Sequence, residues 1–216
     1  TGGVSSNNVA GLVGYNYGTV SNSYATGSVT GGVSSNNVAG LVGYNYGMVS
    51  NSYWDNSFNT VGIGGGTTTG ATGLSSTHMQ QQSSFVGWDL TNTWIVYDGF
   101  TNPLLRSFMT PLTVTANNAT KTYDGLSYSG SNGVTYSSVP NANLLGTASY
   151  SGTSQAGSYV ITPGGLYSNQ QGYLLSYGNG LLTVTQAALT ITANDASKVY
   201  GEIGRASCRE RVFAGC

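Results

Sequence analysis

The feature that most constrains the fold is an internal repeat at the start of the chain. Residues 1–24, TGGVSSNNVAGLVGYNYGTVSNSY, return as residues 30–53 with one change, Thr19 to Met48, so the period is 29 residues. Near-identical units at such a period are typical of architectures in which each unit buries its apolar face only against its neighbours. The sequence therefore predicts stacked copies of one small unit.

Each unit offers short β-strands separated by turns. We expect a strand around residues 9–13, a turn at YNYG and a second strand around residues 19–24. If the units stack as coils of a β-solenoid, each residue lies over its equivalent in the next copy at the spacing between strands. With two copies, a meander or hairpin pairing is the alternative. The pairs that stacking predicts are Val13 with Val42, Tyr15 with Tyr44 and Asn16 with Asn45.

Composition favours an all-β chain without a nucleic-acid surface. Residues 1–201 contain three Lys or Arg and five Asp, spread thinly, whereas a nucleic-acid groove needs clustered cations. β-branched, aromatic and turn residues dominate, and helix formers are few. No apolar run reaches the roughly 18 residues of a membrane helix, so we expect no membrane span.

The pattern changes over residues 56–110, where we expect an irregular segment and a cap. GIGGGTTTGATG is typical of a flexible or tightly turning stretch, and SSTHMQQQ favours one or two helical turns. FVGWDL and TWIVYDGFTNPLLRSF are rich in aromatic residues. We interpret them as a cap that closes the open end of the solenoid, which would otherwise expose unpaired strand edges.

A second kind of repeat begins at Leu112. LTVTANNATKTYD at residues 112–124 reappears as LTITANDASKVYG at residues 189–201, with eight of thirteen positions identical. Alternation in LTVT places Leu112 and Val114 on one face of a half-buried strand. Further strands fit VTYSSV, TASYSG, GSYVIT, YLLSY and GLLTVT. We therefore expect a small Ig-like β-sandwich over residues 111–187 and the start of a second copy at residues 188–201.

Both repeats resemble modules of known families. GLVG at residues 11–14 and 40–43, followed by YNYG, resembles the GLUG repeat of bacterial surface proteins. KTYDG at residues 121–125, with LTVTA before it and GLLTVTQAALTITA closing the segment, resembles the mostly β MBG module. Residues 1–55 are thus interpreted as GLUG repeats and residues 111–187 as an MBG domain.

Together the two modules resemble a filamentous-haemagglutinin-like adhesin or exoprotein, of the type exported by two-partner secretion. The resemblance implies a location outside the cell or on the bacterial outer surface. It also implies two partners: an outer-membrane secretion transporter for the full-length protein, and a glycan or protein on a host or neighbouring cell. Because the chain opens in the middle of a repeat, we expect it to be an internal piece of a longer protein.

The last residues break with the rest of the composition. Both cysteines, Cys208 and Cys216, and both glutamates fall after Gly201. EIGRASCRERV resembles the translation of a common sequencing adapter, so we assign residues 202–216 to readthrough. A disulfide, half of a zinc site and a basic surface tail are the alternatives, and each fits the spacing and composition less well.

Few residues have the chemistry of a catalytic or metal site. Glycoside hydrolysis uses two neighbouring carboxylates, and the repeats contain none; Asp55 and Asp89 each follow a Trp, but they lie far apart in the sequence. His78 is the single histidine, and Asp124 and Asp195 fit turns. We expect no catalytic, cofactor or metal site, and the sequence assigns no ligand-binding residue.

The function expected is that of a non-catalytic piece of an adhesin-like protein that presents repeated β surface. Exposed Tyr, Thr and Asn on the flat solenoid faces are the expected contacts, because they offer aromatic area and hydrogen bonds. Two alternatives remain open from the sequence. One is a fragment of a carbohydrate-active β-helix enzyme, and the other is a structural stalk that binds nothing itself.

Overall fold

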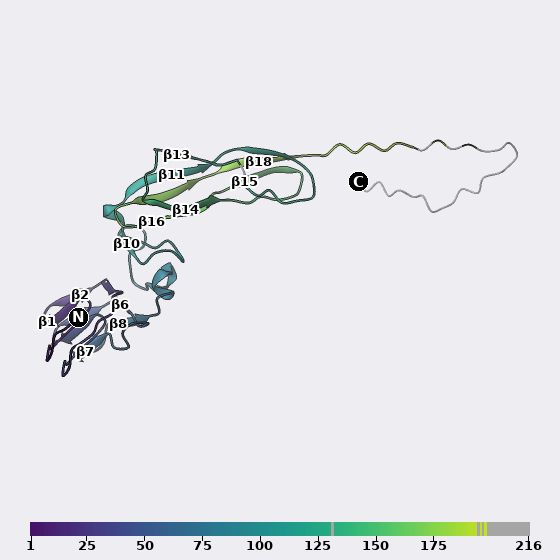
Figure 1. The fold of residues 1–216 in the computed structure, drawn as a ribbon. Helices are drawn as coiled ribbons and strands as arrows, with labels where there is room; N and C mark the ends of the chain where they lie inside the picture. The colour runs from purple at the N-terminus through teal and green to yellow at the C-terminus, as the bar shows by residue number, and fades with distance from the viewer. Residues whose placement is uncertain (131, 194, 196, 198–216) are drawn as a thin grey trace.

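The structure of the chain is a computed structural model that describes residues 1–130, 132–193, 195 and 197. It is all-β: eighteen short strands are arranged in small sheets, and the described helices are three 3₁₀ turns of three residues each. In Figure 1 the first strands form a compact group near the N-terminus, and β11 to β18 form an elongated second group. Within the described residues, no helix is long and apolar enough to cross a membrane.

The N-terminal group consists of turns of chain stacked in parallel. Strands β1 (Val13–Asn16), β4 (Val42–Asn45) and β7 (Ile63–Gly66) form one sheet in that order. β1 and β4 run parallel, and their partners are Val13 with Val42, Tyr15 with Tyr44 and Asn16 with Asn45. The three residue pairs predicted from the period are confirmed, and the hairpin alternative is wrong because a hairpin pairs its strands antiparallel.

Two further ladders complete the stack. β2 (Thr19–Ser21) pairs with β5 (Met48–Ser50), and β3 (Tyr24–Ala25), β6 (Ser52–Asp55) and β8 (Ala71–Leu74) form a three-stranded sheet, all in parallel. β7 and β8 belong to the stretch that we expected to be irregular. This expectation is corrected: the Gly-rich residues add a third layer, and their missing side chains allow the close approach that the layer needs.

The first strand of each unit begins later than predicted. We expected it around residues 9–13, whereas β1 starts at Val13 and includes the Tyr-Asn that we assigned to the turn. Asn8 has a φ of 58° and Asn37 a φ of 51°, in the left-handed region that no strand uses. Two isolated parallel bridges, Asn7 with Asn36 and Ala10 with Ala39, therefore take the place of a strand.

The interior of the stack is apolar with one polar ladder. Its core contains Val20, Ala25, Leu41, Val42, Val49 and Ile63. Asn16 and Asn45 are 5% and 1% exposed, and the Asn16 amide donates to Asn45 Oδ1 at 2.7 Å. The Asn45 amide donates to the carbonyl of Thr67 at 2.8 Å, so the ladder reaches the third layer. Burying these amides is tolerated because each finds a partner in the neighbouring turn.

The aromatic segment after β8 covers the side of the stack. It contains η1 (His78–Gln80), η2 (Gln82–Ser84), β9 (Trp94–Ile95), β10 (Leu104–Leu105) and η3 (Arg106–Phe108), and η1 confirms a helical turn in SSTHMQQQ. Phe85 and Trp88 pack on Tyr53 of the second layer, and Trp88 also lies 6.1 Å from Tyr24 of the first. The segment thus spans the layers laterally, which corrects the expectation that it closes an end.

The C-terminal group has two three-stranded sheets and a two-stranded one. The first has the order β13 (Val134–Tyr136), β11 (Thr110–Ala116), β17 (Tyr173–Gly178); the second has the order β12 (Ala119–Thr122), β18 (Gly180–Thr185), β15 (Gly157–Ile161). β14 (Leu144–Ser149) pairs with β16 (Gly164–Ser168). Leu112 and Val114 are 1% and 0% exposed, so the predicted alternation is confirmed. β12 and β16 were not predicted.

Hydrogen bonds involving Tyr97 and Leu105 join the two groups. The Tyr97 hydroxyl donates to the carbonyl of Tyr173 at 2.7 Å and accepts from the Leu175 amide at 3.0 Å. Gln170 makes two hydrogen bonds with the backbone of Leu105, both at 2.8 Å. These bonds tie the segment after the stack to β17 and the turn before it.

Two predictions fall at the end of the chain. The described residues of 188–193 have no assigned strand, and Leu189 and Ile191 are 83% and 76% exposed. The rest of the predicted second copy lies largely outside the described residues. The adapter-like tail, residues 202–216 with Cys208 and Cys216, lies wholly outside them.

Candidate functional site

Four tyrosines gather on the outer surface of the stack. Tyr15 and Tyr44 are the third residues of β1 and β4, and Tyr17 and Tyr46 follow two positions later. Because side chains alternate along an extended chain, turning Asn16 and Asn45 inward turns all four rings outward. Tyr17 and Tyr46 are 75% and 60% exposed, Tyr15 is 40% exposed and Tyr44 is half-buried. We call these four residues the tyrosine array.

The rings of the tyrosine array contact one another along and between the layers. Within one layer the ring centroids are 4.8 Å apart for Tyr15 and Tyr17, and 4.7 Å for Tyr44 and Tyr46. Between layers, Tyr15 stacks on Tyr44 and Tyr17 on Tyr46, both at 5.5 Å. These distances lie in the range of favourable aromatic pairs. The four rings therefore hold each other in place as a two-by-two surface.

The hydroxyls of the array also influence each other. Side-chain hydrogen bonding with Tyr17 and Tyr46 raises the pKa of Tyr15. Tyr46 raises the pKa of Tyr44 in the same way, whereas hydrogen bonding from Tyr15 and Tyr44 lowers the pKa of Tyr46 itself. Tyr46 is thus favoured over Tyr15 and Tyr44 as the hydroxyl that ionises first when the pH rises.

The array ends at the third layer, where Gly65 and Thr67 take the places of the two tyrosines. Tyr44 pairs with Gly65, and Asn45 pairs with Gly66. A Cβ on Gly65 would lie 2.8 Å from the Tyr44 ring, so that ring rests directly over the glycine backbone. The third layer therefore supports the edge of the array without adding a ring to it.

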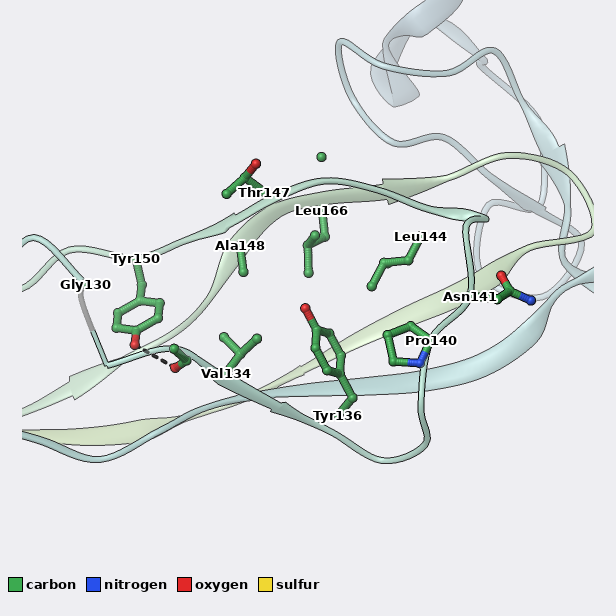
Figure 2. Close-up of a pocket in the computed structure, with 12 residues that line it drawn as sticks. Gly130, Val134, Tyr136, Pro140, Asn141, Leu144, Thr147, Ala148, Tyr150 and Leu166 are labelled. Atoms are coloured by element: carbon green, nitrogen blue, oxygen red, sulfur yellow. Dashed lines mark hydrogen bonds between the residues drawn. The ribbon is translucent and has the colours of Figure 1, made fainter.

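A hollow lies in the C-terminal group, between β13 and β14 (Figure 2). It has a volume of about 410 Å³, and its lining includes Val134, Tyr136, Pro140, Leu144, Ala148 and Leu166. The Tyr150 hydroxyl at its edge donates to the carbonyl of Gly133 at 2.7 Å. Its lining residues include no acid, base or histidine, so it offers apolar contact without acid–base chemistry.

Most of the carboxylates singled out from the sequence bond to nearby turns. Asp55 is 3% exposed and accepts from the Ser57 amide and the Ser76 hydroxyl. Asp89 accepts hydrogen bonds from the backbone amides of Thr91 and Asn92. The hydrogen bond from Asn92 is the main reason that the pKa of Asp89 is lowered. The bonds from the amides of Ser57, Thr91 and Asn92 are those of turn-forming aspartates, whereas the bond from Ser76 joins Asp55 to a segment 21 residues later.

Three other titratable side chains also have hydrogen-bond or ion-pair partners. Asp98 accepts from the Gln82 amide at 2.7 Å, and His78 Nδ1 lies 2.7 Å from the Ser75 hydroxyl. Asp124 forms an ion pair with Lys121 at 2.7 Å, which lowers the pKa of its carboxyl. Among the described residues, no three His, Cys, Asp or Glu side chains gather at one place.

Sequence reasoning found half of the array. The period predicted that Tyr15 lies over Tyr44, and Tyr was named among the expected contacts of the solenoid faces. The period also places Tyr17 over Tyr46, but that both pairs share one face was missed because the whole of YNYG was assigned to a turn, where the side-chain direction does not follow from alternation. The signal was present, since YNY places its two tyrosines two positions apart.

Comparison with protein families identifies both repeat types. The model of the GLUG motif matches residues 5–30, and that of the MBG domain (YGX type) matches residues 112–183. Both are features of bacterial surface, adhesin-like proteins, and the mostly β structure agrees with them. No curated protein and no solved structure is similar enough to the chain to count as a match.

Proposed function

We propose that this chain, which carries a GLUG motif and an MBG domain, is a non-catalytic part of a secreted or surface-displayed bacterial adhesin. Both modules are typical of extracellular or surface proteins. In this proposal the stacked layers are a short β-solenoid and residues 111–187 are an Ig-like sandwich. The solenoid presents the binding surface, and the sandwich extends the molecule away from the cell.

One observation carries the proposal: the tyrosine array is exposed on a surface that the repeat itself builds. Contiguous patches of exposed apolar side chains are uncommon on soluble proteins, and where they occur they often mark interaction sites. Tyr supplies large contact area and a hydrogen-bonding group at low conformational cost. Each added repeat would add two such rings, so the surface grows with repeat number.

The partners proposed are those that the resemblance implies. A glycan or protein on a host or neighbouring cell would contact the array, and an outer-membrane transporter of the two-partner type would export the full-length protein. Two competing functions give different results in one experiment. A carbohydrate-active enzyme depends on single carboxylates, whereas a stalk has no contact surface of its own.

The experiment compares adhesion with turnover. Purified chain is assayed for retention on cultured host and bacterial cells and for hydrolysis or elimination across a glycan panel, beside Asp89→Asn and Asp98→Asn. We expect adhesion that both variants retain and no turnover. Turnover that either substitution abolishes would replace the proposal with the enzyme, and failure to adhere to any cell would replace it with the stalk.

A further inference from the structure

We infer that the tyrosine array is a binding platform for a neutral carbohydrate, whose sugar rings lie flat across the tyrosine rings. This inference rests on the proposed function and names the ligand class of the same surface. It uses three properties of the array, which are its lack of charge, its fixed arrangement and its mixture of aromatic and hydroxyl groups.

The first property is neutrality. Residues 1–54 contain no Asp, Glu, Lys, Arg or His, so both repeats that carry the array have no formally charged side chain at neutral pH. The first carboxylate after them, Asp55, is buried and hydrogen-bonded to Ser57 and Ser76. An anionic ligand such as a nucleic acid, a sulfated glycan or a phospholipid headgroup depends on cations that these repeats do not supply.

The second property is preorganisation. Besides the stacked pairs, Tyr15 also lies 5.5 Å from Tyr46, so contacts run along the layers, between them and across the diagonal. Tyr15 and Tyr44 sit in paired strands, which fixes their backbone positions. A ligand therefore meets rings that are already held, and little side-chain freedom is lost on binding.

The third property is the chemistry of the surface. The face of a tyrosine ring is the negative side of its quadrupole, which attracts the weakly positive C–H groups on the flat face of a pyranose. The phenol hydroxyls can donate to and accept from the sugar hydroxyls at the rim. A pyranose carries both kinds of group on one small ring, so it complements an aromatic surface that has hydroxyls at its edge.

A protein partner fits this surface less well. The energetic centres of protein interfaces are anchors that fill well-packed pockets, often with Arg among them. The array instead protrudes, with its outer rings 75% and 60% exposed, and it has no arginine beside it in the two repeats. In the third layer Gly65 lies opposite Tyr44, and Thr67 follows the Gly66 that pairs with Asn45, so no further ring extends the array and it accepts only a short stretch of sugar.

The test begins with an array of neutral hexose and N-acetylhexosamine oligosaccharides beside sialylated and sulfated ones. The best neutral oligosaccharide is then titrated against the whole chain in low and high salt. We expect neutral glycans to bind, with an affinity that salt leaves unchanged because no ion pair is involved. Preference for anionic glycans, or affinity that falls steeply with salt, would overturn the inference.

Matched variants localise the binding. Tyr17→Ser with Tyr46→Ser removes the two outer rings and should weaken binding about tenfold or more. Phe58→Ser with Phe108→Ser removes two aromatic rings of similar exposure, 58% and 60%, elsewhere on the surface and should leave affinity unchanged. Tyr17→Phe with Tyr46→Phe keeps the rings and should give an intermediate loss, and it serves if the Ser variant fails to fold. If the three double variants bind the oligosaccharide equally well, the tyrosine array is not its binding site.

The outcomes separate this inference from the proposed function. Cell adhesion that persists in the Tyr17 and Tyr46 variants, or that protease treatment of the cells abolishes, would remove the neutral-glycan platform and leave an adhesin with another contact. Binding of the neutral oligosaccharide without adhesion to any cell would keep the platform and remove the adhesin. Adhesion that neutral oligosaccharide inhibits, and that the Ser variant loses, supports both.

Discussion

At the scale of single residues, buried polar side chains hold the layers together because each has its partner in the next layer. Asn45 accepts from Asn16 and donates to Thr67, so it connects three layers through one side chain. Asn7 and Asn36 form an equivalent pair across the first two layers, but this bond is longer, 3.2 Å, and exposed. The buried pair of Asn16 and Asn45 thus stabilises the stack, whereas the exposed pair of Asn7 and Asn36 contributes little to its stability.

Asn45→Ala should destabilise the stack by about 1–3 kcal/mol, because it removes the hydrogen bonds to Asn16 and Thr67 and leaves the buried Asn16 amide with only its 3.2 Å bond to the carbonyl of Met48. Asn36→Ala is the matched control and should change the free energy of unfolding by less than about 0.5 kcal/mol, since water replaces the lost bond. Denaturant unfolding measures both. Equal effects of the two substitutions would contradict the role assigned to the buried ladder.

Tyr24 predicts a pH dependence. Its hydroxyl donates to the carbonyl of Pro103 at 2.7 Å, and burial raises its pKa from 10.0. A raised pKa means that the folded state holds the proton more tightly than the unfolded state. The stability that Tyr24 contributes is therefore fully present below the unfolded pKa, and it is lost as the pH rises through the folded pKa.

Tyr24→Phe should therefore lower stability by about 1 kcal/mol at pH 7, through the lost hydrogen bond. It should also make the decline in stability between pH 9 and 11 shallower than in the native chain. Thermal melts across this range test both effects. A decline of the same steepness in the variant would show that Tyr24 does not contribute to the alkaline loss.

At the scale of elements, close approach between layers explains why the repeat contains so many glycines. Gly18 and Gly47 occupy the same position in the two copies. A Cβ on Gly47 would lie 2.0 Å from the carbonyl oxygen of Gly18, whereas a Cβ on Gly18 would meet nothing within 4 Å. The difference exists because Gly18 is in the first layer and Gly47 lies beneath it.

This asymmetry gives a direct test of the stacking. Gly47→Ala should destabilise the stack by about 1–3 kcal/mol, since a backbone atom must move. Gly18→Ala should be neutral, or stabilising by up to about 1 kcal/mol through the unfolded chain, because neither glycine has a positive φ. If these two sites, whose local sequences differ only at Thr19 and Met48, respond equally, the copies do not stack in the order described.

The elements that could be predicted were those with a regular pattern. The period placed Tyr15 over Tyr44, and alternation placed Leu112 and Val114 in the core. The third layer was missed because IGGG lacks the side chains from which a strand is recognised. The lateral packing of Trp88 was missed because contacts between distant segments leave no periodic trace in the sequence.

At the scale of the whole molecule, the number of repeats sets the size of the proposed binding surface. Each 29-residue unit contributes one rung to each ladder, one buried Asn and two outward-facing Tyr. In an array of this kind, stability is roughly the sum of unit and interface terms, so a further identical unit should add to the stack. Binding and stability should then change together.

The most direct measurement inserts a second copy of residues 1–29 between residues 29 and 30, and compares it with the native chain and with a chain lacking residues 1–29. Retention on cells and on the neutral oligosaccharide is measured beside thermal stability. We expect retention on cells, retention on the oligosaccharide and thermal stability all to rise from the deletion to the native chain to the insertion. The chain with the inserted copy should bind severalfold more tightly. Folded variants that bind equally well would contradict this expectation, because the contact surface would then lie outside the repeats.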